Sequence, residues 1–256
     1  MTSNEKYQHY IIPELQNFWS VYRRDYIGSG LVDGLMLPYT YEGYDSCTKK
    51  IFYIGQDAPY WLSKQCMTTL FDKNKYLQYL HINNEVMHPL EKRFAWGNST
   101  SFWTMIVKTH LYILTNKWYG DINHISSADK VLLDTMGYGN VHFIPLPQTI
   151  HWYSGARINE SSYKVVDDAL KSFNYLQIIV ENFEPDTIVL LGVAFDKKRY
   201  FAGLNIRWSE PSNFISVGEY EYKNKMIKLL WVYNPNYYRF AGTNMHKVAN
   251  LIKSFS

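Results

Sequence analysis

The stretch 51–60 constrains the fold of this chain more than any other. Its first four residues are apolar and run directly into Gly55. A short apolar run that ends in glycine is typical of a buried strand in a parallel sheet, and the glycine lets the backbone turn at the strand end. We therefore expect Gln56 and Asp57 at the carboxyl edge of the sheet, where open α/β folds bind their ligands. The competing interpretation is that Asp57 only caps a turn or a helix.

Three further apolar runs predict strands, at 141–144, 187–192 and 228–233, the first of them after a turn over 137–140. Helical spacing is found over 7–26, 102–114, 162–183 and 244–254, and residues 205–227 are typical of a hairpin. Strands that alternate with helices predict a single α/β domain over residues 1–256. We expect a three-layer sandwich whose central four-stranded parallel sheet is flanked by helices. This arrangement would align four polar loops along one edge, at 56–57, 145–149, 193–199 and 234–239.

Composition and missing motifs exclude several classes of protein. The formal charge of +3 and the pI near 8.6 are compatible with nucleic acid without requiring it. The sequence has no Gly-x-Gly-x-x-Gly, Walker or Gly-x-Ser-x-Gly motif and no paired metal ligands, so we expect neither cofactor nor metal. Two cysteines, a polar N-terminus and apolar runs too short to cross a bilayer predict a cytoplasmic protein without a membrane partner.

The four loops, in this order, resemble those of the uracil-DNA glycosylase superfamily. In its best-known family the first strand ends in Gly-Gln-Asp-Pro-Tyr-His, and here residues 55–60 are Gly-Gln-Asp-Ala-Pro-Tyr. A Leu-Ala-Phe motif precedes a helix in the family, and here 94–96 are Phe-Ala-Trp. The family's second strand ends in Leu-Leu-Leu-Asn-Thr-Val-Leu-Thr, and here 142–149 are His-Phe-Ile-Pro-Leu-Pro-Gln-Thr.

Two later segments complete the resemblance, which spans residues 50–255. A strand like Leu-Leu-Trp-Gly followed by a lysine pair corresponds to Val-Leu-Leu-Gly at 189–192 with Lys197 and Lys198. The family's His-Pro-Ser-Pro-Leu-Ser corresponds to Asn-Pro-Asn-Tyr-Tyr-Arg at 234–239. The first motif is the only close match, and the order and spacing of all five carry the resemblance.

Three departures from the family bear on the choice of base. The base-reading asparagine of the family falls on Pro145, which offers no side-chain hydrogen bond. The family's histidine falls on Asn234, although related mismatch-specific glycosylases also carry Asn-Pro there. The tyrosine that excludes 5-substituted pyrimidines falls on Pro59, or on Tyr60 if one residue is inserted. We therefore expect a modified base, rather than plain uracil, as the substrate.

The resemblance implies a catalytic group made of Asp57, Gln56 and Asn234. Cleavage of the C1′–N bond passes through an oxocarbenium-like transition state, which needs an anion near the sugar and a placed water. Asp57 would polarise the water and stabilise the positive charge of the sugar. Asn234 would orient the water or the leaving base, and its alternative role is that of a turn residue before proline.

The resemblance also implies a pocket for a base that has left the DNA stack and a surface that holds the DNA. Stacking is expected from Trp96, or from Phe94, although either is equally suited to a core. Base reading is expected from Gln148, with Pro59 and Tyr60 beside carbon 5. A DNA wedge is expected from Tyr238 or Arg239, beside Tyr237. Phosphate contacts are expected from Lys197, Lys198 and Arg199, whose alternative is a solvated charged surface.

Two other functions remain open at this level. A member of the same fold could bind DNA or a protein without catalysis, which the loss of the base-reading asparagine favours. An N-glycoside hydrolase could act on small nucleosides, but the aromatic loop 236–240 favours DNA as partner. The leading prediction is a monomeric, monofunctional DNA glycosylase that excises a modified base and leaves an abasic site, in DNA repair or in defence against modified foreign DNA.

Overall fold

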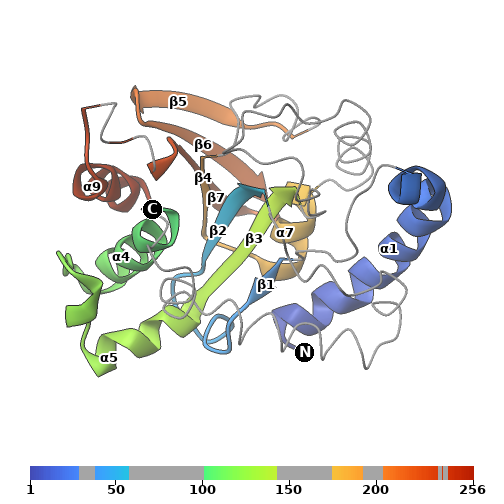
Figure 1. Cartoon of the computed structure of the whole chain (residues 1–256), viewed down its shortest axis with the longest axis horizontal. Helices are drawn as coiled ribbons and strands as arrows, with labels where there is room; N and C mark the ends of the chain where they lie inside the picture. The colour runs from blue at the N-terminus through green and yellow to red at the C-terminus, as the bar shows by residue number, and fades with distance from the viewer. Residues whose placement is uncertain (29–37, 58–100, 143–174, 193–203, 236–237, 239–241) are drawn as a thin grey trace.

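The computed structural model describes residues 1–28, 38–57, 101–142, 175–192, 204–235, 238 and 242–256, and all its strands belong to one mixed seven-stranded sheet (Figure 1). The strand order is β1-β3-β2-β4-β7-β6-β5. The three central pairs, β3–β2, β2–β4 and β4–β7, are parallel, and the remaining pairs are antiparallel. The strands are β1 (Tyr39–Thr40), β2 (Ile51–Asp57), β3 (Met136–His142), β4 (Thr187–Leu191), β5 (Arg207–Ser212), β6 (Ile215–Tyr222) and β7 (Lys225–Val232).

The prediction of a four-stranded parallel sheet is wrong, although the α/β class is confirmed. Four parallel strands form only the centre, and antiparallel strands extend the sheet on both sides. The predicted hairpin exists as β5 and β6, but β6 also pairs with β7 through a two-residue turn. Lys223 and Asn224 in that turn have φ of 48° and 64°. Positive φ at both positions is typical of the tight turn that matches the twist of a hairpin.

Strand β3 begins at Met136, so the predicted turn over 137–140 is wrong. Gly137 pairs with Phe52 across β3 and β2, and a Cβ at Gly137 would overlap the Phe52 ring. Gly137 is therefore needed for the close packing of its backbone against the Phe52 ring rather than for a turn.

The described helices are α1 (Ser3–Gly28), α4 (Ser101–Thr115), α5 (Ser127–Lys130), α7 (Tyr175–Phe183) and α9 (Met245–Phe255), with 3-10 turns η2 (Ile122–His124) and η3 (Val131–Thr135). Helices α1, α4, α7 and α9 correspond to the four predicted helical segments, whereas α5 and the two 3-10 turns were not predicted. The predicted helix 162–183 is confirmed from Tyr175 onward, and its earlier part lies outside the described residues. The single domain over 1–256 concerns the whole chain and stays a prediction.

Two consecutive residues of β2 show how the helices cover both faces of the sheet. Neighbouring strand residues point to opposite faces. The ring of Phe52 packs at 5.2 Å from Phe183 of α7, whereas the hydroxyl of Tyr53 lies 3.3 Å from His110 of α4. Because α1 packs with α7, and α4 with α9, the sheet lies between two helix pairs (Figure 1). No helix in the described ranges is long and apolar enough to cross a membrane.

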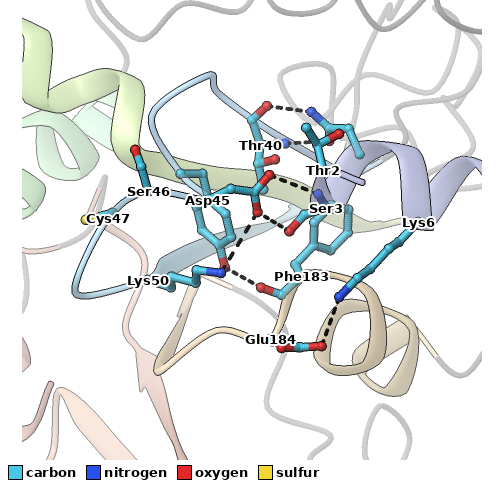
Figure 2. Close-up of polar contacts among 12 residues, drawn as sticks. Thr2, Ser3, Lys6, Thr40, Asp45, Ser46, Cys47, Lys50, Phe183 and Glu184 are labelled. Atoms are coloured by element: carbon cyan, nitrogen blue, oxygen red, sulfur yellow. Dashed lines mark hydrogen bonds and ion pairs between the residues drawn. The ribbon is translucent and has the colours of Figure 1, made fainter.

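Polar contacts attach the start of α1 to the sheet edge and to the loop that follows β1 (Figure 2). The backbone N–H and the hydroxyl of Ser3 both donate to the Asp45 carboxylate. Asn4 behaves like one residue of an added strand, since its amide donates to the Thr40 carbonyl at 2.8 Å and accepts from the Thr40 N–H at 3.0 Å. The short edge strand β1 is thereby covered, which protects it from pairing with another chain.

Candidate functional site

The carboxyl ends of β3, β2, β4 and β7 lie along one edge of the sheet. Asp57 ends β2 opposite His142 of β3, while Leu191 of β4 pairs with Val232 of β7. Parallel pairing thus aligns the ends of the four strands that precede the predicted polar loops. Gln56 and Asp57 are placed by their backbone at this edge, and their side chains are outside what the structure describes.

At the β2–β3 end of the edge, an asparagine side chain lies against a glycine. A Cβ at Gly55 would overlap the Asn140 amide oxygen and would lie 3.0 Å from the Phe102 ring. The Asn140 oxygen accepts a hydrogen bond of 2.8 Å from the Tyr138 hydroxyl. Both residues are buried, and burial raises the pKa of Tyr138 well above its ordinary value, so the hydroxyl keeps its proton. Glycine at position 55 therefore admits a buried polar pair directly beside the Gln-Asp segment.

At the β4–β7 end, a second asparagine lies against a second glycine. Gly192 follows β4 with φ of 66°, and its N–H donates to the Val232 carbonyl at 3.0 Å. A Cβ at this position would lie 2.9 Å from the Asn234 amide nitrogen and 3.0 Å from its Cβ and Cγ. Asn234 is only half-buried, in contrast to Asn140, of which 2% is exposed. Of the two amides, Asn234 is thus the one placed to reach a ligand.

The strand order fixes the separations between these groups. Adjacent strands are about 4.8 Å apart, so the backbones of β2 and β7, with β4 between them, are about 10 Å apart. Side chains that extend from both ends can bracket a sugar and a water across that span. The backbones of Asn140 and Asn234 are three strand spacings apart, or about 14 Å. Asn140, buried and bonded to Tyr138, packs against the β2 end, whereas half-buried Asn234 lies two strands from the Gln56–Asp57 segment.

His110 is a fully buried residue on α4. Its Nε2 lies 3.1 Å from the Leu132 carbonyl, which can only accept, so we place the proton on Nε2. Its Nδ1 then accepts from the Tyr53 hydroxyl at 3.3 Å. Burial lowers the pKa of His110 to about 4, so the ring is neutral at neutral pH. Within the described ranges, no three His, Cys, Asp or Glu side chains gather closely enough to hold a metal.

Tyr238, predicted to contact DNA as a wedge, is buried in the structure. Only 3% of this residue is exposed, because its ring belongs to the hydrophobic core. Burial also raises the pKa of its hydroxyl, which has no hydrogen-bond partner in the structure as described. A buried ring cannot serve as a DNA wedge in this conformation. Its chain position, in an aromatic loop after the last parallel strand, gave no sign of burial.

The remaining predicted site residues all lie outside the described residues. These are Pro59, Tyr60, Phe94, Trp96, Pro145, Gln148, Lys197, Lys198, Arg199, Tyr237 and Arg239. The structure thus brings together the backbone of Gln56 and Asp57 with Asn234, and the roles of the others stay predictions. Sequence reasoning missed Asn140 and Gly192. Strand alternation over 137–140 was the available signal, since it puts two glycines on one face and Tyr138 with Asn140 on the other.

No protein-family model and no curated protein matches this chain.

Proposed function

We propose that this protein is a DNA glycosylase that hydrolyses the N-glycosidic bond of a modified base and leaves an abasic site. The observation that carries the proposal is the shared edge: Gln56 and Asp57 end β2, and Asn234 follows β7, two strands away in a parallel array. The resemblance of the loop sequences requires these segments to meet at one edge, and the parallel pairing is compatible with that requirement.

In the proposed mechanism Asp57 supplies the anion. Its carboxylate polarises a water and stabilises the positive charge that develops on the sugar as the C1′–N bond breaks. The water adds its oxygen to C1′, its proton passes to Asp57, and the bond electrons leave with the base. Asn234 orients the water or the base through its amide. An amide is uncharged, so Asn234 cannot lend the positive charge that a histidinium would give to the leaving base.

The substrate in this proposal is a modified base rather than plain uracil. Pro145, where the family has its base-reading asparagine, offers no side-chain hydrogen bond. A pocket without buried polar groups discriminates weakly between close analogues, because the wrong ligand leaves nothing unpaired. Pro59 at the position of the family's methyl-excluding tyrosine would leave room for a substituent on carbon 5.

The test is a panel of oligonucleotides that carry uracil, hypoxanthine, 5-hydroxymethyluracil or glucosylated cytosine, followed by alkaline cleavage at abasic sites. We expect faster release of a modified base than of uracil. Asp57→Asn should reduce kcat about 10²- to 10⁴-fold, the usual range for loss of a general base, with DNA binding retained. Asp121→Asn is the matched control, because Asp121 caps η2 through its side-chain oxygen and an asparagine can keep that bond. Undiminished turnover by Asp57→Asn, or selective excision of plain uracil, would contradict the proposal.

One observation favours a second candidate, an N-glycoside hydrolase that acts on free nucleosides. The preference for DNA depended on an aromatic loop after β7, and the structure buries the Tyr238 ring of that loop. The same panel distinguishes the two candidates if the corresponding free nucleosides are included. Base release from nucleosides but not from oligonucleotides would replace the first proposal with the second, and no release from either would overturn both.

A further inference from the structure

Gly192 is the residue against which the Asn234 side chain rests. The Gly192 N–H is bonded to β7 at the Val232 carbonyl, so its backbone is fixed relative to the strand that leads to Asn234. Its Cα then faces the Asn234 amide so closely that a Cβ would lie 2.9 Å from Nδ2 and 3.0 Å from Cγ. Real side chains essentially never keep contacts this short, so any larger residue at 192 would have to move the amide.

Two independent requirements therefore demand glycine at this position. The first is conformational, since φ of 66° lies in the left-handed region that glycine adopts without cost. The second is the space that the Asn234 side chain occupies. Gly242 shares the first requirement alone: its φ is 70°, and a Cβ there would meet none of the described residues within 4 Å. The chain thus contains its own control for separating backbone strain from displacement of the amide.

We infer that Gly192 is a positioning residue for the candidate site, which by its missing Cβ holds the Asn234 amide at the carboxyl edge between β4 and β7. The inference rests on the proposed function insofar as Asn234 orients the water or the base. An amide held against rigid backbone is already in place before a ligand arrives. Displacement of such a group by about 1 Å can reduce turnover 10²-fold, although the displaced group is still present.

The first test compares Gly192→Ala with Gly242→Ala in the full chain. Both variants should lose a few degrees of Tm through the left-handed backbone. Only Gly192→Ala should also lower kcat for base release from oligonucleotides, by about 10- to 100-fold, with KM little changed. Rates are normalised to folded protein, so that a loss of stability alone does not lower them. Equal kcat values in the two variants would overturn the inference.

The second test reads the position of the amide without any activity. The side-chain amide resonances of Asn234, identified by their loss in Asn234→Ala, should shift in Gly192→Ala and stay in place in Gly242→Ala. Asn234→Gly removes the crowding, so the Tm loss caused by Gly192→Ala should fall to that of Gly242→Ala in the double variant. Unchanged resonances, or additive Tm losses, would show that Gly192 does not set this position.

The two tests separate the inference from the function on which it rests. If the wild-type protein releases no base, the proposed function is overturned, while the amide resonances still decide whether Gly192 positions Asn234. If the wild type is active and the resonances shift without a loss of kcat, Gly192 positions the amide but the site does not depend on it, and the inference is overturned.

Discussion

His110 makes the stability of this protein depend on pH in a window that the structure defines. The ring is fully buried between Tyr53 and the Leu132 carbonyl, and its pKa is lowered from 6.5 to about 4, mainly by desolvation. In the unfolded chain the same ring takes up a proton near pH 6.5. The unfolded state therefore binds more protons below pH 6.5, and acid favours it.

The size of the effect follows from the two pKa values. Stability is fully present above pH 6.5, is lost as the pH falls through the window, and levels off below pH 4. The complete shift amounts to about 3 kcal/mol, and about 2 kcal/mol of it is lost between pH 7.5 and pH 5. This is a large part of the 5–15 kcal/mol that is typical of a folded domain.

Urea unfolding at pH 7.5 and pH 5, followed by far-UV circular dichroism, measures this loss. His110→Gln keeps a donor and an acceptor but cannot take up a proton, so its free energy of unfolding should change about 2 kcal/mol less than that of the wild type. His124→Gln is the control, because His124 is exposed, and it should behave like the wild type. If His110→Gln and the wild type lose equal stability on acidification, the ring is not desolvated as the structure places it.

Two further predictions concern the sheet. Asn4→Ala removes both hydrogen bonds to the β1 backbone and should lower the free energy of unfolding by about 1–3 kcal/mol in urea titrations, whereas Asn205→Ala, at an exposed position, should change it by no more than about 0.5 kcal/mol. Gly137→Ala should cost about 1–3 kcal/mol, because its Cβ would overlap the buried Phe52 ring, and Gly120→Ala, where a Cβ meets none of the described residues within 4 Å, should differ little from the wild type. Equal midpoints within either pair would contradict the contact concerned.

The sequence predicts β2 and β4 well because each of these central strands carries its signal locally. Residues 51–54 and 188–191 are apolar throughout, which burial on both faces requires, and both runs form parallel strands. The outer strands have no such signal. β5 alternates irregularly and is largely exposed, so its pattern indicates a hairpin but not the sheet to which the hairpin adds. The extent of the sheet depends on pairing between β6 and β7, which a pattern within one strand does not encode.

The wrongly predicted turn over 137–140 also shows that contacts between strands are not visible in a local sequence pattern. Glycines at 137 and 139 usually punctuate turns, but here Gly137 leaves room for the Phe52 ring of the neighbouring strand. The need for glycine at position 137 comes from the Phe52 side chain, which is distant in the sequence. Tyr238 repeats the point, since an aromatic residue in a loop becomes core only through the elements that pack around it.

The residues of the candidate site also differ in how far the sequence predicts them. Asp57 and Asn234 were found from sequence because each follows a strand that can be recognised by itself. Their supports, Asn140 against Gly55 and Gly192 against Asn234, are contacts between strands and have no signature within either segment. Asn140 is bonded to Tyr138 and buried, whereas Asn234 is half-buried after the end of β7. Asn140 thus packs against the strand that carries Asp57, and in our proposal Asn234, positioned by Gly192, is the amide that faces a ligand between β2 and β7.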